Sequence, residues 1–443
     1  MTTRRTPPAP VPRSRLGRIA RMGLAAGELA AGAAAEGLRR IVRGQAPDFR
    51  GALLSTSNAQ KLAARLARLR GAAMKLGQLV SLQGEDVLPP EFAQALAVLR
   101  SQAAPMPREQ LRRVLGREYG KGWERRFASF DEEPLAAASI GQVHRAIAAD
   151  GRDLALKIQY PGVARSIASD VDNVAALLRL LNLLPVDLDV AGIAAEAKRQ
   201  LAQEADYLAE ARFLERYARL VADDPALLVP RVHRDLTTRH VMAMDYVAGE
   251  PLDSLAAAPQ ARRNAVGTAL ERLLFRELFE FRVMQTDPNF ANYLVQPDSG
   301  RVVLLDFGAT RAFTAGFVAE FARITRGVVD DDRGAVAQAA IRIGYAAPDD
   351  PPERLDAVVD VCFLVCEPLR HAGRYDFGRS DLASRVRDLG FELAFRRRLL
   401  RPPPPETIFL HRKLVGSFLL LARIGAQVDA RSLVMPYLPK QRQ

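Results

Sequence analysis

The chain has 443 residues, of which 49% are hydrophobic and 26% charged, so it can bury a large core and form one large bilobal unit or two to three domains. Lys and Arg outnumber Asp and Glu by 63 to 51, and the net charge of +12 favours a polyanionic partner: nucleic acid, an anionic membrane or nucleotide phosphates. Zinc-ligand spacing, helix-turn-helix signatures and aromatic RNA-binding motifs are absent from the sequence, which makes nucleic acid a weaker choice. No uncharged apolar run reaches the roughly 18 residues of a membrane span.

Residues 1–50 are predicted to form a disordered basic tail and an amphipathic helix. The first 14 residues are rich in proline and arginine, and residues 15–43 are rich in Ala and Gly with arginines at both ends. This second segment could lie on an anionic membrane surface, pack as an ordinary helix or act as an organelle transit peptide. The residues alone leave the three alternatives open.

Residues 51–110 are predicted to form a helical extension, in which Leu62, Leu66 and Leu69 begin an apolar stripe of helical spacing. Within this stripe lies the sequence KLGQ, from Lys75 to Gln78. Composition alone indicates only an exposed Lys and Gln beside a Gly that weakens the helix.

A possible nucleotide loop and its lysine follow in the next segment. Ala136, Ala138, Gly141 and Val143 stand at the positions of a protein-kinase GxGxxGxV loop, and Lys157 ends a strand-like run as the strand-three lysine of a kinase does. Alanine adds a Cβ that limits positive φ and close backbone approach to phosphate, so this loop is expected to bind nucleotide differently. The alternative is a buried hairpin with a lysine at its edge.

After Lys157, residues 166–193 read as a helical insertion that a minimal kinase lobe lacks. The strongly helical stretch that follows carries Glu204, Asp206 and Glu210. A protein kinase pairs its strand-three lysine with a glutamate of a helix, and either Glu204 or Glu210 could supply it. The alternative is an ordinary solvated acidic face.

The sequence HRDL, from His233 to Leu236, spells a kinase catalytic motif but is rejected as the active site. His240 stands where the second metal ligand should be Asn. The motif also precedes an apolar run, through residues 244–247, that reads as the hinge between lobes, and a catalytic loop must follow the hinge.

Residues 284–310 hold the candidate active site. Asp287 is followed five residues later by Asn292, and the motif Asp306-Phe307-Gly308 comes after a short β-branched run. This spacing matches the catalytic Asp and the two metal ligands of a kinase, and their hard oxygen atoms suit the Mg²⁺ that phosphoryl transfer requires. The alternative is a turn capped by Asp287 and an ordinary strand end at Asp306.

From residue 312 onward the chain is predicted to be mainly helical. It shows no APE-type segment or obvious activation-loop phosphosite, so docking of protein substrates in the usual kinase manner is not expected. Cys362 and Cys366 lie four residues apart on a predicted helix, where they read as small buried hydrophobes in a reducing compartment.

Six motifs in order resemble the UbiB/AarF family of atypical kinases, in particular its mitochondrial-type coenzyme Q biosynthesis ATPases: KLGQ, AAASIGQVH, LALKIQYPGV, EADYLAEA, QTDPNFANYL and LLDFGATR. The resemblance covers roughly residues 60–425. It implies an α+β class and a bilobal protein-kinase-like fold with an N-terminal helical extension and a mostly helical C-lobe. The expected divisions are the tail and helix (1–50), the extension with its KxGQ motif (51–110), the N-lobe with its insertion (111–246) and the C-lobe (247–443).

The resemblance also implies a role for each matched residue. Lys75 and Gln78 are the regulatory signature of the extension, with Lys75 in the cleft where a peptide would bind, and Asp287, Lys157 and Lys75 form the catalytic set. Asn292 and Asp306 are the implied Mg²⁺ ligands. The implied nucleotide-binding residues, ending with the hinge that meets adenine, are Ala136, Ala137, Ala138, Ser139, Lys157, Glu204, Asp206, Glu210, Met244, Asp245, Tyr246 and Val247. Which glutamate pairs with Lys157 and which with Lys75 stays open.

The implied function is a Mg²⁺-dependent ATPase or atypical kinase that uses ATP, supports ubiquinone biosynthesis and phosphorylates proteins little in trans. One alternative is an ATP-binding scaffold or chaperone that regulates contacts with membrane lipid or biosynthetic complexes. The other is a small-molecule phosphotransferase, disfavoured because Lys75 should block the cleft. The expected partners are ATP or ADP, an anionic membrane surface and quinone-biosynthesis proteins or lipid precursors, with a homodimer left open. The expected location is cytoplasmic, peripheral on the inner membrane, and organelle targeting is also left open.

Overall fold

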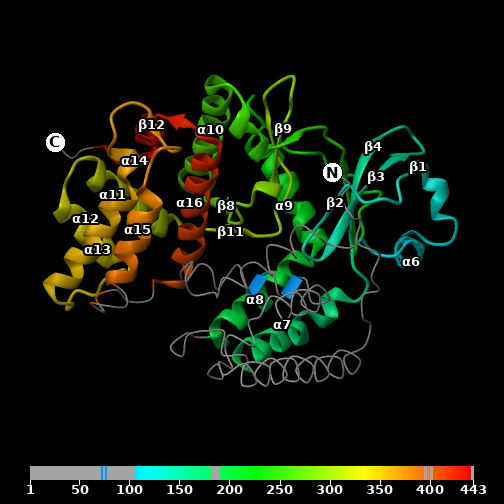
Figure 1. Cartoon of the computed structure of the whole chain (residues 1–443), viewed down its shortest axis with the longest axis horizontal. Helices are drawn as coiled ribbons and strands as arrows, with labels where there is room; N and C mark the ends of the chain where they lie inside the picture. Colours follow the sequence, from blue (N-terminus) through cyan, green and yellow to red (C-terminus); the bar gives the residue numbers. More distant parts are fainter. Residues whose placement is uncertain are drawn as a thin grey trace, which may run out of the picture. The chain divides into compact units, whose positions relative to one another are not determined.

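The computed structural model describes residues 71–72, 75–76, 105–180, 190–393, 397, 399 and 403–440 (Figure 1). Two compact units are present, and the boundary between them falls inside helix α9 (Tyr207–Leu220). The first unit comprises the chain up to Ala211 together with Val232–Tyr246, and the second comprises Arg212–Arg231 together with Val247 onward. Gln78, the predicted tail and helix of residues 1–50, and most of the predicted extension lie outside the described residues.

The first unit is built on an antiparallel sheet with the order β1-β3-β4-β6, in which the short β2 also pairs with β3. Its strands are β1 (Phe127–Phe130), β2 (Ala136–Ala137), β3 (Gly141–Ala148), β4 (Asp153–Gln159) and β6 (Val241–Asp245). Strand β4 is central and buried over nearly its whole length. The register places Lys157 of β4 between Val143 of β3 and Met242 of β6. The lysine that the sequence placed at a strand end therefore lies inside a central strand.

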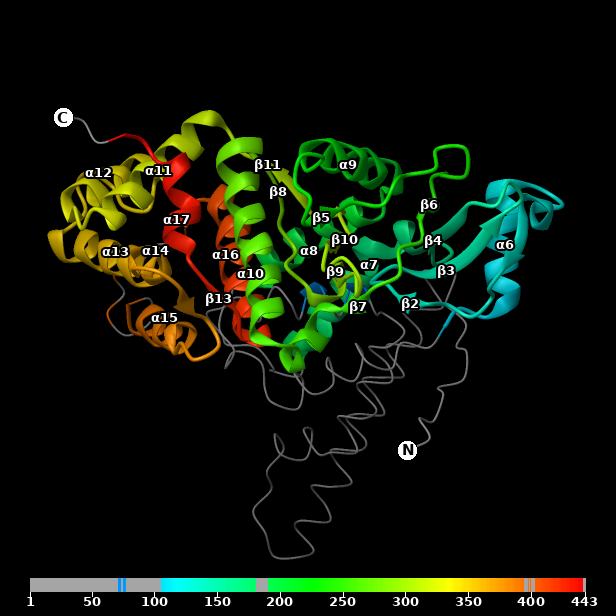
Figure 2. The ribbon, with the colours of Figure 1, turned by 90° about the horizontal axis from the view of Figure 1, so that it is seen from above.

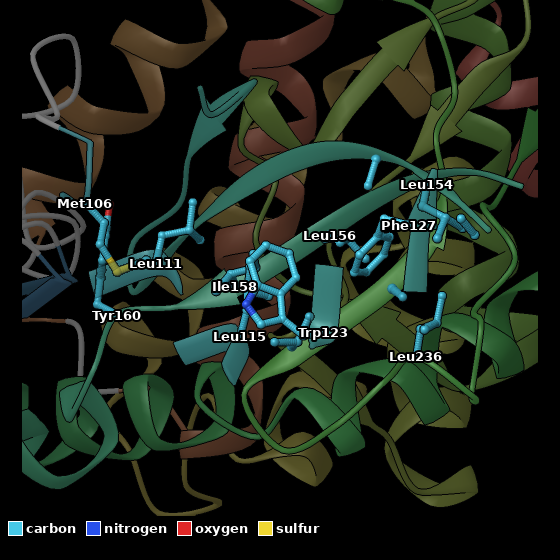
Figure 3. Close-up of a cluster of buried hydrophobic side chains, with 14 residues drawn as sticks. Met106, Leu111, Leu115, Trp123, Phe127, Leu154, Leu156, Ile158, Tyr160 and Leu236 are labelled. Atoms are coloured by element: carbon cyan, nitrogen blue, oxygen red, sulfur yellow. The ribbon is translucent and has the colours of Figure 1, made fainter. Parts of the chain in front are cut away.

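Helix α6 (Arg108–Tyr119) and the 3-10 turn η3 (Trp123–Arg126) pack against the strands of this unit through a hydrophobic cluster (Figure 3). Leu111 and Leu115 of α6 lie in the same cluster as Leu154 and Leu156 of β4, all at most 1% exposed. Full burial of each such side chain contributes about 1.5–3 kcal/mol. This packing holds the strand that carries Lys157.

Between β4 and β6 in the chain lie α7 (Val163–Leu180), α8 (Val190–Glu204) and the first turn of α9, which also belong to the first unit. The acidic stretch predicted to be helical is divided into α8 and α9 by a break at residues 205–206. Asp206 caps α9, because its Oδ1 accepts a hydrogen bond of 2.9 Å from the Ala209 amide. The break places the acidic side chains before it and after it on two different helices, so they can contact different partners.

The second unit contains three small sheets. A four-stranded sheet has the order β5-β10-β9-β7, and two further pairs are β11-β8 and β12-β13. The strands are β5 (Leu227–Leu228), β7 (Glu250–Pro251), β8 (Val283–Gln285), β9 (Tyr293–Val295), β10 (Val302–Leu304), β11 (Thr310–Ala312), β12 (Tyr375–Asp376) and β13 (Gln427–Val428). Strand β10 confirms the strand predicted before Asp306.

The rest of the second unit is mainly helical, as predicted. Its helices are α10 (Gln260–Phe275), α11 (Ala315–Val329), α12 (Arg333–Ile343), α13 (Pro352–Val365), α14 (Glu367–Arg370), α15 (Leu382–Phe391), α16 (Pro405–Ile424) and α17 (Ala430–Val434), with the 3-10 turns η4 (Leu252–Ala257), η6 (Phe290–Asn292) and η8 (Met435–Tyr437) and the π-helical turn η5 (Arg276–Phe281). Helices α10 and α16 lie side by side (Figures 1 and 2). Among the described residues, no helix combines the length and the apolar character needed to cross a bilayer.

Cys362 lies in α13 and Cys366 at its end, and both are free thiols. Burial raises the pKa of each thiol to about 12. Since the thiolate is the reactive form, neither cysteine is a nucleophile at neutral pH. Both are half-buried and pack against a hydrophobic cluster of the second unit, so they are less buried than the sequence predicted.

Candidate functional site

Lys157 pairs with Glu210 inside the first unit. The Nζ atom of Lys157 lies 2.6 Å from Oε1 of Glu210, and the two residues are 8% and 1% exposed. The buried ring of Tyr207 lies 5.3 Å from the same ammonium group, measured to the ring centroid. Breaking such a buried pair leaves an uncompensated charge, so each partner fixes the position of the other. Of the two glutamates left open by the sequence, Glu210 is the partner of Lys157.

Glu204 has two other partners. Its Oε1 lies 2.6 Å from Nζ of Lys75, which is only 3% exposed, and its Oε2 accepts a hydrogen bond of 2.6 Å from the Ser139 hydroxyl. Glu204 therefore joins the lysine of the KLGQ motif to the serine that ends the alanine-rich loop. Asp206, the next acidic residue after Glu204 in the sequence EADYLAEA, caps α9.

The alanine-rich loop is a tight hairpin formed by β2 and β3. Ala136 pairs with Val143, and the Ala138 amide donates a 2.9 Å hydrogen bond to the Gly141 carbonyl. Ala136 and Ala137 are exposed, so their methyl groups cost nothing in packing. A Cβ at Gly141 would lie 2.4 Å from the Ile158 carbonyl oxygen, which explains why a glycine occupies this position.

The segment predicted to be the hinge begins in β6. Met244 is buried opposite Ala155 of β4, and the Asp245 carboxylate accepts a 2.7 Å hydrogen bond from His233 Nε2. The Arg145 guanidinium lies 4.2 Å from the centroid of the Tyr246 ring. These side chains make contacts within the first unit. An adenine base at this segment would therefore meet the backbone groups of the segment.

The rejected HRDL motif lies in the same unit as this hinge strand. Asp235 is 58% exposed and forms a 2.7 Å ion pair with Arg152, whose guanidinium also contacts His233. Asp235 thus takes part in an ion pair at the surface, whereas His233 and Leu236 of the motif are buried.

In the second unit, backbone hydrogen bonds bring Asp287, Asn292 and Asp306 together. The Leu305 amide donates 3.0 Å to the Asn292 carbonyl, which places Asp306 next to Asn292. The Thr286 amide donates 2.9 Å to the Ala309 carbonyl, which places Asp287 beside the same turn. The three side chains come from the ends of β8, η6 and β10, and all are half-buried.

The orientation of two of these side chains suits Mg²⁺. Nδ2 of Asn292 donates a 2.8 Å hydrogen bond to the Asp287 carbonyl, so the amide presents its oxygen on the other side. Oδ1 of Asp306 accepts 2.9 Å from the Gly308 amide, which fixes the carboxylate. Mg²⁺ in phosphotransfer sites takes one or two such protein oxygens together with phosphate oxygens and water. Within the described ranges no cluster of three or more His, Cys, Asp or Glu side chains is arranged to hold a metal ion.

A buried ion pair supports the strands on both sides of this loop. Oε1 of Glu277 accepts hydrogen bonds from the Gln285 amide (3.0 Å) and the Tyr217 hydroxyl (2.9 Å), and its Oε2 lies 2.9 Å from Nζ of Lys413. Burial alone would lower the pKa of Lys413, but the charge of Glu277 and the neighbouring Tyr293 outweigh burial and raise it. Glu277 and Lys413 were missed in the sequence, where a glutamate in an amphipathic helix reads as a solvated one.

Arg412 was also missed. It lies one residue before Lys413 in α16, is 8% exposed, and forms an ion pair with Oδ1 of Asp287. The available signal was a pair of adjacent cations in a largely apolar helix, and that signal does not indicate a partner.

The fold and the site define a protein-kinase-like protein. The first unit has the antiparallel sheet with a buried Lys157–Glu210 pair, and the second has Asp287 and Asn292 in a loop that precedes Asp306-Phe307-Gly308.

Known proteins share both the sequence and the fold. Residues 98–340 match the ABC1 atypical kinase-like domain. The chain is 41% identical to the mitochondrial atypical kinase COQ8B of Rattus norvegicus, over 96% of this chain and 80% of that one, and 37% identical to the mitochondrial atypical kinase COQ8 of Saccharomyces cerevisiae, over 96% and 84%. A solved structure, the complex of Rv3197 with erythromycin from Mycobacterium tuberculosis, aligns with a TM-score of 0.61 and 26% identity over 87% of this chain and 97% of that one. The chain therefore belongs to the ABC1 (UbiB) family of atypical kinases, which confirms the family and the fold predicted from its motifs.

Proposed function

We propose that the protein is a Mg²⁺-dependent ATPase or atypical phosphotransferase that supports ubiquinone biosynthesis. The observation that supports the chemistry most directly is the joining of Asp287, Asn292 and Asp306 by backbone hydrogen bonds from separate elements. The similarity to the atypical kinases COQ8B and COQ8 supports the biosynthetic role.

Each group then has a distinct task. Lys157 binds the phosphates of ATP and is held in place by Glu210, while Asn292 and Asp306 would hold Mg²⁺. The metal ion, when bound, neutralises charge on the phosphates during transfer. Asp287 orients the attacking hydroxyl or water and accepts its proton.

Lys75 is proposed to restrict which acceptor reaches the site. Its ammonium group is buried on Glu204, which also binds Ser139 of the alanine-rich loop. A change at the KLGQ motif would therefore alter the contacts of the alanine-rich loop, which is the proposed nucleotide loop. We therefore expect ATP hydrolysis rather than phosphorylation of a protein in trans.

The chemistry can be tested with Asp306→Asn, which should abolish ATP hydrolysis by the purified protein. Asp298 lies exposed in the turn between β9 and β10, so Asp298→Asn is a matched control that should hydrolyse ATP normally. Undiminished turnover by Asp306→Asn would refute the assignment of the metal site.

The biosynthetic role needs a separate test in cells. Deletion of the gene should lower the ubiquinone content, and the wild-type gene but not the Asp306→Asn variant should restore it. If quinone levels stay unchanged after deletion, the catalytic assignment is unaffected but the proposed pathway is wrong.

We also propose peripheral attachment to an anionic membrane, which the net charge of +12 supports. The protein should float with vesicles that contain an anionic phospholipid and should remain in solution with neutral phosphatidylcholine vesicles. Nucleotide-dependent flotation that persists in Asp287→Asn would favour the scaffold alternative instead, because it would separate membrane binding from turnover.

A further inference from the structure

Helix α16 presents two adjacent cations to the catalytic stretch of the second unit. Lys413 pairs with Glu277, which accepts a hydrogen bond from the Gln285 amide at the end of β8. Arg412 pairs with Asp287, two residues further along. The same helix thus binds both the strand that leads into the loop and the loop carboxylate itself.

A glycine on the same face of α16 brings the helix backbone against the loop. Gly416 lies one helical turn after Arg412, and a Cβ added there would lie 2.0 Å from Cγ of Pro288. Pro288 directly follows Asp287, so the close approach fixes the distance between α16 and the residue that Arg412 holds. Arg412 and Gly416 therefore act on adjacent residues of one loop.

Stability alone does not account for the guanidinium group of Arg412 beside the catalytic loop. Arg412 is 8% exposed and the Asp287 side chain 20%, so both charges have lost most of their hydration. Buried ion pairs can often be replaced by apolar groups without loss of stability. A planar guanidinium, however, holds a carboxylate in one orientation, because its donors have a fixed geometry.

We propose that Arg412 is a positioning residue for phosphoryl transfer, an inference that rests on the function proposed above. By holding Oδ1 of Asp287, Arg412 turns Oδ2 toward the acceptor hydroxyl or water. In the transfer step the acceptor oxygen forms a bond to the γ-phosphorus, and the bond to the bridging oxygen breaks with its electron pair leaving on ADP. The acceptor proton passes to Oδ2 of Asp287. Arg412 touches neither ATP nor the acceptor in this scheme.

The first test removes the guanidinium and then returns it. In Arg412→Ala, kcat for ATP hydrolysis should fall by about 100-fold, the scale expected for a misplaced reacting group, while KM for ATP and directly measured nucleotide affinity change little. Guanidinium ion at tens of millimolar, well below denaturing concentration, should restore part of kcat, and urea at the same concentration should not. Arg412→Lys should give an intermediate kcat. Arg423 lies exposed near the end of the same helix, so Arg423→Ala is the matched control and should behave as wild type.

The second test displaces the loop without changing any charge. Gly416→Ala should lower kcat, because the added methyl group pushes the backbone of Asp287 and Pro288 away from Arg412. Gly316 of α11 has open space around its Cβ position, so Gly316→Ala introduces the same residue into a helix and should retain wild-type kcat.

The outcomes separate this inference from the proposed function. Wild-type turnover in Asp287→Asn would refute the catalytic assignment itself. If Asp287→Asn is inactive while Arg412→Ala keeps wild-type kcat, the catalytic assignment stands and the role of Arg412 is wrong. Faster hydrolysis by Arg412→Ala would also overturn the inference, because the ion pair would then restrain Asp287. If Arg412→Ala and Arg412→Lys lose the same amount of kcat, and both also lose nucleotide affinity, Arg412 has a structural role only.

Discussion

Lys413 of α16 and Glu277 of the π-helical turn form an ion pair of 2.9 Å whose side chains are 4% and 1% exposed. Glu277 also accepts hydrogen bonds from Tyr217 and from the backbone of β8. The pair therefore joins α16 to the strand that leads into Asp287. Its burial and its position make it a structural requirement of the catalytic loop.

Loss of Lys413 should destabilise the protein strongly. Lys413→Met leaves the Glu277 carboxylate buried without its cation, which typically costs about 3–5 kcal/mol. The melting temperature should fall accordingly, and the double variant Lys413→Met, Glu277→Leu should recover part of the loss. Lys440→Met, at an exposed position, is the control and should melt as wild type. Equal melting temperatures for the Lys413 variant and the control would contradict the prediction.

The two lysine–glutamate pairs of the first unit should be energetically separate. A double-mutant cycle on Lys75 and Glu204, read by thermal unfolding, should show a coupling energy of about 0.5–3 kcal/mol, because the two side chains touch. A cycle on Lys75 and Glu210 should show much less, since Glu210 pairs with Lys157. A larger coupling in the second cycle would mean that the pairing is reversed.

Glu271 should make stability fall as the pH rises. Burial raises the pKa of this carboxyl from 4.5 to about 7, although the charge of Lys413 opposes the shift. The unfolded chain ionises first, so stability is full below pH 4.5 and is lost as the pH rises through 7. Glu271→Gln removes this loss, and at pH 8 it should be more stable than wild type by roughly 1–3 kcal/mol. At pH 4.5 the two proteins should have similar unfolding free energies, and a constant difference across this range would count against the prediction.

His411 should make the stability of the protein fall as the pH decreases. Burial lowers its pKa from 6.5 to about 4, and the Tyr345 hydroxyl lies 2.7 Å from its Nε2. The unfolded state takes up the proton first, so the stability supplied by neutral His411 is present above pH 6.5 and is lost as the pH falls toward 4. His411→Gln should flatten the stability curve between pH 6.5 and 4 compared with wild type. An unchanged slope would show that His411 does not titrate in this range.

Local patterns predicted part of the fold and part of the site. The strand before Asp306, the helices after residue 312 and the rejection of HRDL rest on contiguous residues with a clear period, a turn signal or an order along the chain. The predicted single helical stretch around Glu204 was less accurate, because the break at residues 205–206 depends on Asp206 accepting a hydrogen bond from the backbone. A solvated acidic face and a set of specific ion pairs have the same spacing along a helix, so periodicity cannot separate them.

By itself, the sequence determined the family, the kinase-like fold and the order of the chemical groups, because these depend on short motifs whose residues are neighbours in the chain. Only the tertiary structure decided which charges meet: Lys157 with Glu210 across 53 residues, Lys75 with Glu204 across 129, and Arg412 with Asp287 across 125. The physical reason is that a buried ion pair forms where packing brings two distant segments together and removes water from both charges. In the sequence, each of these charged residues cannot be distinguished from a charged residue on the solvated face of a helix or strand.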